Sequence, residues 1–145
     1  MITAGLFTST TDNWATPQEL FERLNTRYNF TLDPCASKYN HKCAEYYTRE
    51  QDGLAQDWGG HSVFCNPPYG RNIGKWIKKA SEEAAKPNTT VVLLLPARTD
   101  TAWFHDYIYK KADVEFLSGR LKFGGCGNSA PFPSMIVTMR KEAEK

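Results

Sequence analysis

The residues best suited to chemistry are Asn66-Pro67-Pro68-Tyr69, which directly follow the apolar run Val63-Phe64-Cys65. The Asn66 side-chain oxygen and the Pro67 carbonyl form a pair of acceptors that can hold both hydrogens of a planar amino group. Such a nitrogen is a poor nucleophile because its lone pair is delocalised, and two acceptors would shift it towards tetrahedral geometry. Proline lacks an N–H and restricts the residue before it, so these acceptors are in place before a substrate arrives. Tyr69 could stack on the ring that carries the amine, whereas the plainer interpretation is an Asn-Pro-Pro turn.

Three other segments carry residues that could bind a ligand. Thr16-Pro17 is expected to begin a helix, with Thr16 as the cap and Glu19 three residues later. The free N–H groups of a helix N-terminus attract an anion. Asp33-Pro34-Cys35-Ala36 follow a short strand over 30–32, and Asp52-Gly53-Leu54 follow a polar region. Each segment has a plain alternative, namely a helix cap, a turn that ends a strand and an Asp-Gly turn.

Strand and helix patterns alternate along the chain, which predicts an α/β fold with a mostly parallel sheet. In such sheets ligands bind at the carboxyl ends of the strands, and Asp33, Asn66 and Pro96 all fall at that edge. The segment 120–133 is glycine-rich and is expected to be a loop or hairpin. Strands are expected at 30–32, 45–48, 62–65, 90–95, 114–117 and 135–139, and later helices at 73–85 and at 101–111, the last capped by Asp100.

The tetrapeptide Asn66-Pro67-Pro68-Tyr69 resembles the Asp/Asn/Ser-Pro-Pro-Tyr/Phe/Trp signature of the amino-methyltransferases. The resemblance implies that these four residues form the catalytic loop and that S-adenosylmethionine is the methyl donor. Thr16-Pro17 resembles the segment whose helix N-terminus meets the donor's carboxylate. Asp52-Gly53-Leu54 resembles the motif whose acid contacts the donor's adenine amino group.

The segment Asp33-Pro34-Cys35-Ala36 resembles the family motif at the end of the first strand, with one departure. Both expected glycines are absent, and Ala36, Ser37 and Lys38 stand in that region. No acid clearly matches the one that holds the donor's ribose hydroxyls, so Glu45 and Glu50 remain alternatives. The cofactor-binding residues that the resemblance implies are Thr16, Pro17, Asp33, Pro34, Cys35, Ala36, Asp52 and Asn66.

Longer stretches extend the resemblance over almost the whole chain, at 14–21, 30–37, 52–54, 65–70, 94–101, 119–123 and 130–134. Together they are similar to the small phage-type Dam family of DNA N6-adenine methyltransferases. The resemblance implies a shortened Rossmann-like class I methyltransferase fold, with a mostly parallel sheet and an antiparallel C-terminal hairpin. It also implies methyl transfer to the N6 amino group of adenine in duplex DNA, by base flipping and direct in-line attack.

The same resemblance suggests which side chains meet DNA. Arg71 and Lys75 follow the catalytic loop, and Arg98 follows the strand at 90–95 and could meet a phosphate. Arg120, Lys122 and Phe123 lie where related enzymes pack an aromatic ring against the flipped base, and Phe132 could serve as well. The plain alternatives are surface cations and core phenylalanines.

The composition fits one domain over residues 1–145, with 1–12 expected to be flexible. A net charge of +2 is weak support for a polyanionic partner. The four cysteines form no close metal-type pair, so reduced thiols and no metal are expected. The longest apolar run is far shorter than a membrane span, and no signal peptide is recognisable, which favours the cytoplasm. With no segment long enough for a target-recognition domain, specificity would come from loops or from a homodimer.

Two other functions stay open at this level. The same loop could methylate another delocalised nitrogen, such as adenine in RNA or a protein glutamine amide. Alternatively, the chain could be a non-catalytic DNA-binding relative, for which the missing glycines after Asp33 are the best support.

Overall fold

The computed structural model describes residues 14–124 and 129–141, and this part of the chain contains one six-stranded sheet. The strand order is β2-β1-β3-β4-β6-β5, parallel from β2 to β4 and antiparallel for β4–β6 and β6–β5. The predicted mostly parallel sheet with an antiparallel C-terminal pair is therefore confirmed. The strands are β1 (Leu32–Ala36), β2 (Glu45–Thr48), β3 (Ser62–Cys65), β4 (Thr90–Pro96), β5 (Asp113–Phe116) and β6 (Ser134–Arg140).

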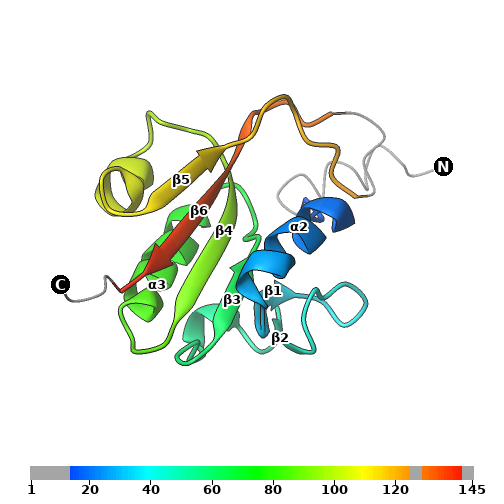
Figure 1. Cartoon of the computed structure of the whole chain (residues 1–145), viewed down its shortest axis with the longest axis vertical. Coiled ribbons are helices and arrows are strands. Elements are labelled where there is room, and N and C mark those ends of the chain that lie inside the picture. The colour runs from blue at the N-terminus through cyan, green and yellow to red at the C-terminus, as the bar shows by residue number, and fades with distance from the viewer. Residues whose placement is uncertain (1–13, 125–128, 142–145) are drawn as a thin grey trace.

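Helices cover both faces of this sheet (Figure 1). Helix α2 (Gln18–Tyr28) lies in front of the sheet in that view and buries Phe21 and Leu24. Helix α3 (Ile73–Ala84) lies behind and buries a stripe that includes Trp76 and Ile77. Two short segments complete the fold, a 3-10 helix η1 (Gly53–Ala55) and a π-helical turn η2 (Phe104–Ile108). None of the helices in the described part of the chain is long and apolar enough to cross a membrane.

Strand β4 forms the centre of the core. Its residues from Val91 to Leu95 are completely buried, β3 and β6 pair with its two edges, and α3 packs against it. A continuous β-branched and leucine run is typical of such a doubly covered strand.

The connections diverge between β1 and β3, at the middle of the parallel part of the sheet. From β1 the chain goes to β2 on one side, and from β3 it goes to β4 on the other. The carboxyl ends of β1 and β3 meet at this switch point, where open α/β sheets form a crevice that binds ligands. The fold thus brings together the segment that begins at Asp33 and the segment that begins at Asn66.

Three expectations about local structure were wrong. Thr16 does not cap α2, because Pro17 occupies the N-cap position without a side-chain cap and the Thr16 hydroxyl accepts a hydrogen bond from Asn66. The helix expected at 101–111 is shorter, with helical residues from 102 to 108 of which the last five form η2. Its first turn is capped by Thr101, whose hydroxyl accepts from the Phe104 N–H at 3.3 Å, and not by Asp100.

The first strand also differs, because it continues through Asp33-Pro34 to Ala36 instead of ending there. Proline lacks the N–H that a regular ladder needs. The pairing of β1 with β2 shifts register between Asp33 and Ala36, and β1 pairs with β3 only at Leu32. Pro34 therefore lies in an irregular part of the strand, where its missing N–H breaks no regular bond.

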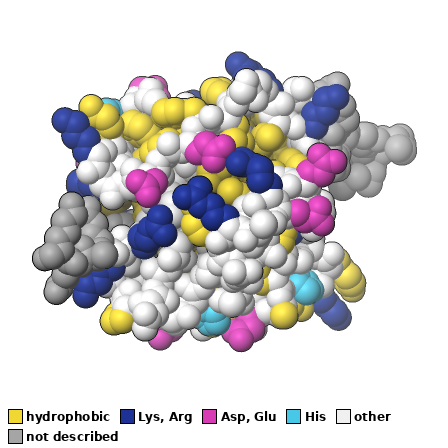
Figure 2. Space-filling model, in the orientation of Figure 1, with side chains coloured by type: hydrophobic (Ala, Val, Ile, Leu, Met, Phe, Trp, Pro, Cys, Tyr) yellow, Lys and Arg dark blue, Asp and Glu magenta, His cyan; other side chains and the backbone are white. Residues whose placement is uncertain are grey.

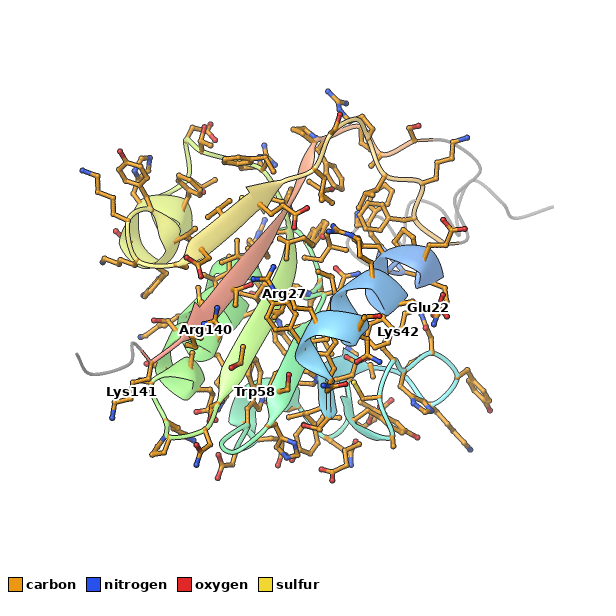
Figure 3. All side chains as sticks on the ribbon, in the orientation of Figure 1. Glu22, Arg27, Lys42, Trp58, Arg140 and Lys141 are labelled. Carbon is orange, nitrogen blue, oxygen red and sulfur yellow. The ribbon has the colours of Figure 1, made fainter. Side chains whose placement is uncertain are left out.

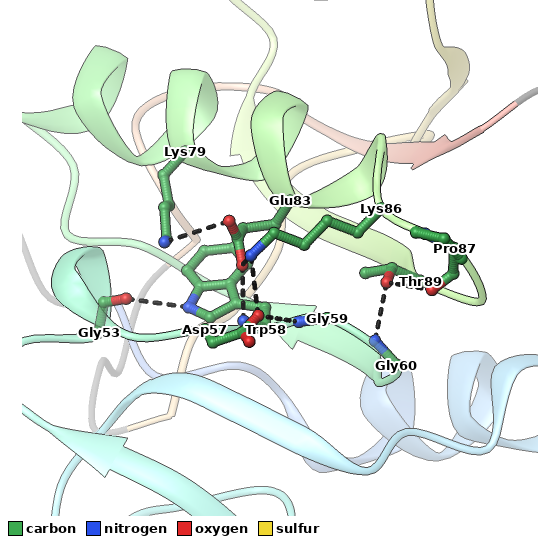
Figure 4. A network of polar contacts seen from close by, with 10 residues as sticks. All are labelled: Gly53, Asp57, Trp58, Gly59, Gly60, Lys79, Glu83, Lys86, Pro87 and Thr89. Atoms are coloured by element: carbon green, nitrogen blue, oxygen red, sulfur yellow. Dashed lines mark hydrogen bonds and ion pairs between the residues drawn. The ribbon is translucent and has the colours of Figure 1, made fainter.

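A buried polar network joins the end of α3 to the segment before β3 (Figure 4). The Glu83 carboxylate accepts the Trp58 backbone N–H at 2.6 Å and the Lys86 ammonium at 2.8 Å, and Lys79 lies 3.3 Å away. The Trp58 indole N–H donates to the Gly53 carbonyl at 2.9 Å. Although burial opposes its ionisation, the hydrogen bonds from Lys86 and Trp58 and the charge of Lys79 lower the pKa of Glu83. The network therefore fixes η1 against α3.

We expect Glu83→Gln to lower the free energy of unfolding by about 1–3 kcal/mol at neutral pH, because charge-assisted hydrogen bonds are lost. The folded-state pKa of Glu83 lies below its ordinary value of 4.5, so its stabilisation is complete above that pH and disappears as the pH falls through the folded-state pKa. Urea unfolding should therefore separate the variant from the wild type at neutral pH, and the difference should shrink as the pH falls below 4.5. Glu82→Gln, at the exposed neighbour, is the control and should change little. An equal effect of both substitutions would contradict the network.

Candidate functional site

A cavity of about 610 Å³ opens at the carboxyl ends of β1 and β3. Of the eight residues predicted to bind the cofactor, seven line it, and Pro17 does not. Of the predicted catalytic loop, Asn66 and Pro68 line it, and Pro67 and Tyr69 do not. The remaining walls come from residues that were not among the predicted cofactor-binding or catalytic residues: Trp14, Ala15, Ser37, Asn40, Lys42, Thr48, Arg49, Gly53, Phe64, Asn72 and Trp76.

The Asn66 side chain has one satisfied and one unsatisfied end. Its amide nitrogen donates to the Trp14 carbonyl and to the Thr16 hydroxyl, the latter at 2.9 Å. Its oxygen Oδ1 is buried and has no hydrogen-bond partner among the described residues. A buried acceptor without a donor costs free energy, and such atoms in native proteins call for a functional explanation. Asn66 thus offers a free acceptor beside the cavity.

Tyr69 lies in an aromatic cluster with Trp14, Phe123 and Phe132. Its hydroxyl donates to the Leu94 carbonyl at 2.9 Å, and its ring is edge-on to Phe132 with centroids 5.6 Å apart. Trp14 contacts both phenylalanines edge-on, at 5.4 and 5.3 Å. Burial raises the pKa of Tyr69 well above its ordinary value, so the phenol stays neutral. In this arrangement Tyr69 anchors the loop to β4, and its stacking on a substrate ring stays a prediction.

The loop after β1 closes around a carboxylate instead of a glycine turn. Asp33 accepts the Cys35 N–H at 3.2 Å and the Lys42 N–H at 2.9 Å, and a small bridge pairs Ser37 with Asn40. Burial raises the pKa of Asp33, against the opposing effect of these two hydrogen bonds. The two backbone donors show how the chain can turn here although both expected glycines are missing.

The glycine that allows close packing lies instead at position 53. A Cβ atom on Gly53 would stand 2.1 Å from the Pro34 carbonyl oxygen, which is far inside van der Waals contact. The backbone of η1 therefore presses directly on the end of β1. The neighbouring Asp52 has a left-handed backbone with φ of 55°, and its Oδ1 accepts the Leu54 N–H at 3.2 Å. The second carboxylate oxygen of Asp52 is therefore able to accept a hydrogen bond from a ligand in the cavity, which Asp52 lines.

Neither candidate for the ribose acid lines the cavity. Glu45, at the start of β2, lies 3.5 Å from His61, and Glu50 is an exposed residue beyond the end of that strand. Thr48 and Arg49, at the carboxyl end of β2, line the cavity instead. No motif marked these two residues, although the rule that ligands bind at carboxyl ends could have pointed to them once the strand at 45–48 was taken as parallel.

Lys42 was also missed from the sequence. It lies next to α2 (Figure 3), and its ammonium donates to the side-chain carbonyl of Gln18 at 2.7 Å. Burial lowers the pKa of Lys42, while the charges of Asp33 and Glu22 oppose that shift. Lys42 belongs to no recognisable motif. Its position beside the start of α2 is known only from the folded loop.

The described cysteines are free thiols with the properties of packing residues. Burial, with a smaller effect of Asp33, raises the pKa of both Cys35 and Cys43 to about 12, and Cys65 is completely buried. A thiol reacts as the thiolate, so these side chains are poor nucleophiles near neutral pH. Cys126 lies outside the described residues.

The predicted DNA-contacting cations are exposed and lie at one end of the sheet, beyond the carboxyl ends of parallel strands. Arg71 and Lys75 follow β3, and Arg98 follows β4. Arg120 and Lys122 follow β5, which runs parallel to β4 because both are antiparallel to β6. These five side chains thus come after carboxyl ends of strands, on the side of the sheet where the cavity opens. Phe123 is buried and Phe132 half-buried in the aromatic cluster.

The face that carries α2 has a different character. Basic and acidic side chains alternate there (Figure 2), and pairs such as Arg23–Glu115 at 3.1 Å and Arg140–Asp113 at 3.7 Å neutralise one another. A nucleic-acid surface needs positive charge that is not compensated by acids. This face is therefore less suited to DNA than the carboxyl edge.

Comparison with known proteins places the chain in a family. The family model described as DNA N-6-adenine-methyltransferase (Dam) matches residues 4–144, and the chain belongs to this family of methyltransferases. The family expected from the motifs is thus confirmed.

Two phage proteins illustrate the relationship, and both are named DNA N-6-adenine-methyltransferase. The one from Escherichia phage T1 is 36% identical over 112 residues, which is 76% of this chain and 46% of that protein. The one from Haemophilus phage HP1 is 32% identical over 109 residues, 74% of this chain and 62% of that protein. The chain therefore matches only about half to two thirds of the length of these relatives.

A solved structure from Thermoplasma acidophilum, provisionally described as a methyltransferase, covers 89% of this chain and 56% of its own, with a TM-score of 0.39 at 12% identity. Similarity at this level is too low to bear on the site or its chemistry.

We expect Gly53→Ala to destabilise the protein by about 1–3 kcal/mol or more, because the new methyl group meets the Pro34 carbonyl. Gly74→Ala is the matched control, since its Cβ would have no neighbour closer than 3.8 Å and alanine favours a helix. Thermal unfolding should show a lower Tm for the first variant and an unchanged or higher Tm for the second. If both variants unfolded at the wild-type temperature, the close approach of η1 to β1 would be refuted.

Proposed function

We propose that the protein is a DNA methyltransferase that transfers a methyl group from S-adenosylmethionine to the N6 amino group of adenine. The observation that carries the proposal is the buried, unpartnered Oδ1 of Asn66 beside a cavity at the switch point of the sheet. An amide oxygen that lacks a donor matches an amine that has hydrogens to give. Membership of the Dam family, whose phage relatives bear the name of this activity, supports the choice of adenine in DNA.

The cavity fits the methyl donor by size and by the chemistry of its walls. About 610 Å³ lies within the range of small-molecule sites, and the walls mix aromatic, amide, acidic and basic groups. Bound S-adenosylmethionine would supply an electrophilic sulfonium methyl group for direct in-line transfer, so that no covalent intermediate with the enzyme is needed. Asp52 has a free carboxylate oxygen for the donor's adenine amino group.

Lys42 is the group that we assign to the donor's carboxylate. Its ammonium is partly stripped of water, and its side-chain hydrogen-bond partner is the neutral amide of Gln18, at the first residue of α2. An arriving carboxylate would replace lost hydration of this cation and would also meet the positive end of the helix dipole. The methionine end of the bound donor would thus lie towards α2, and its adenine end towards Asp52.

On the substrate side, Asn66 Oδ1 and the Pro67 carbonyl hold the two hydrogens of the amine. The base has to leave the duplex to reach them, at a cost of a few kcal/mol. Arg71, Lys75, Arg98, Arg120 and Lys122 surround the carboxyl edge, where phosphate contacts would position the duplex without reading its sequence. Tyr69, Phe123 and Phe132 form the aromatic cluster that supports the catalytic loop, and of these three rings only Phe132 is half-buried instead of buried.

The alternative of a non-catalytic relative loses its main support, because Asp33 closes the loop after β1 with two backbone hydrogen bonds. The loop can turn around the cavity without the glycines that the motif leads one to expect.

We expect Asn66→Ala to reduce methyl transfer by about 100- to 1,000-fold or more, because a preorganised hydrogen bond to the reacting group is lost. Transfer of a tritiated methyl group from S-adenosylmethionine to DNA lacking N6-methyladenine measures the loss. Binding of S-adenosylhomocysteine, measured by calorimetry, should be largely retained in the variant and shows that the site is still folded.

Parallel reactions with RNA and with protein test the choice of substrate. Full activity of Asn66→Ala, label in RNA or protein but not in DNA, or failure of the wild type to bind S-adenosylhomocysteine would each defeat the proposal. Sequencing with modified-base detection then identifies the methylated base.

We expect Lys42→Ala to weaken S-adenosylhomocysteine binding by about 10- to 100-fold, the effect of losing one charge-assisted hydrogen bond. The same variant should bind 5′-methylthioadenosine, which has no carboxylate, as well as the wild type does. Lys38→Ala is the matched control from the same loop, because Lys38 is exposed and does not line the cavity. Equal losses for the two ligands would show that Lys42 acts on the fold of the site and not on the carboxylate.

A further inference from the structure

The surroundings of the Asn66 side chain allow only one orientation of its amide group. A carbonyl oxygen accepts hydrogen bonds and cannot donate them. Because the Trp14 carbonyl contacts the Asn66 side chain, the amide nitrogen has to face it, and the Thr16 hydroxyl takes the second hydrogen of that nitrogen at 2.9 Å. The oxygen is thereby turned away from residues 14–16 and kept free of partners.

The segment that provides these two acceptors is itself held firmly. The Gly124 N–H donates to the Ala15 carbonyl at 2.9 Å in an isolated antiparallel bridge. The Trp14 ring packs against Phe123 and Phe132, and Thr16 is buried. Directly after Thr16 the Pro17 carbonyl accepts the Phe21 N–H at 3.1 Å, which joins the segment to α2. The two acceptors therefore belong to a rigid support of the catalytic loop.

We propose that the Trp14 carbonyl and the Thr16 hydroxyl are positioning groups that aim the Asn66 oxygen at the substrate amine, and that they make asparagine, not aspartate, the required residue at position 66. The inference rests on the proposed function, since it explains how the acceptor of that reaction is aligned. It also gives Thr16 a role beyond the cofactor contact expected from its motif.

Aspartate is excluded at position 66 because of the Trp14 carbonyl. An aspartate at position 66 would bring a carboxylate oxygen against the Trp14 carbonyl, and two acceptors repel one another. The Thr16 hydroxyl could turn its hydrogen towards the carboxylate, but the Trp14 carbonyl has no hydrogen to offer. Only the protonated acid could donate to Trp14 and still present a free C=O oxygen, as the asparagine does.

The first test compares Thr16→Val with Thr16→Ser. Valine keeps the shape but removes the acceptor, so kcat should fall about tenfold, the factor that one neutral hydrogen bond supplies. The KM for DNA should change little, and serine should restore most of kcat. Thr89→Val is the matched control, because Thr89 is equally buried and hydrogen-bonded but lies away from the cavity. It should lower stability without changing kcat.

The second test is the pH profile of Asn66→Asp. Its kcat should be far below that of the wild type at pH 8 and should approach it as the pH is lowered towards the pKa of the new acid, whereas Asn66 itself does not titrate. Other titratable groups around position 66 are shared by both proteins, so the ratio of the two profiles isolates the new acid. These groups are Asp33, Cys35, Lys42, Arg49, Asp52, Cys65 and Tyr69.

Two results would overturn the inference. One is a Thr16→Val variant whose kcat matches that of Thr89→Val, and the other is an Asn66→Asp variant with full activity at every pH. Either result leaves the proposed function intact, provided that Asn66→Ala is inactive. A fully active Asn66→Ala variant would instead refute the proposed function itself. Failure of the inference and failure of the proposed function are therefore distinguishable.

Discussion

The cavity depends on the way in which the chain leaves the two central parallel strands. β1 and β3 are neighbours, but their connections run to opposite sides of the sheet, so the space beyond their carboxyl ends is left open. Every group that we assign to the reaction reaches this space from a strand end or from a loop that folds back over it. Because the position of the opening is a property of the topology, the site can be assembled from segments that are far apart in the chain.

Buried polar groups then give the opening its shape. The Asp33 carboxylate gathers two backbone N–H groups, and the Glu83 carboxylate joins α3 to the segment that ends at Trp58. Trp58 in turn holds the Gly53 carbonyl, and Gly53 presses on Pro34. These contacts connect the back of the sheet to the cavity wall, which explains how a short chain can keep a rigid site. Among the described residues that line the cavity, Oδ1 of Asn66 is the one buried side-chain atom without a hydrogen-bond partner, and the proposed chemistry depends on this atom.

Much of the fold could be predicted because local patterns and tertiary packing agree. The apolar run at 90–95 became the buried strand β4, and the stripe of Trp76 and Ile77 became the inner face of α3. Predictions failed where a side chain had a better partner elsewhere. Thr16 looks like a helix cap in the sequence, yet its hydroxyl bonds to Asn66, fifty residues away. Pro34 looks like the end of a strand, yet an irregular register allows the strand to continue.

The sequence by itself determined the family, and it singled out Asn66-Pro67-Pro68-Tyr69 as the loop that we propose to be catalytic, because these four residues combine restricted backbone and paired acceptors. It also determined that the segments around Asp33 and Asp52 belong to the same site, since their motifs occur in a recognisable order. Only the tertiary structure decided that Lys42, Thr48 and Arg49 line the cavity, that Tyr69 anchors the loop, and that Trp14 and Thr16 orient the Asn66 amide. The physical reason is that a motif records local geometry, whereas the partner of a buried polar atom is chosen by how distant segments pack.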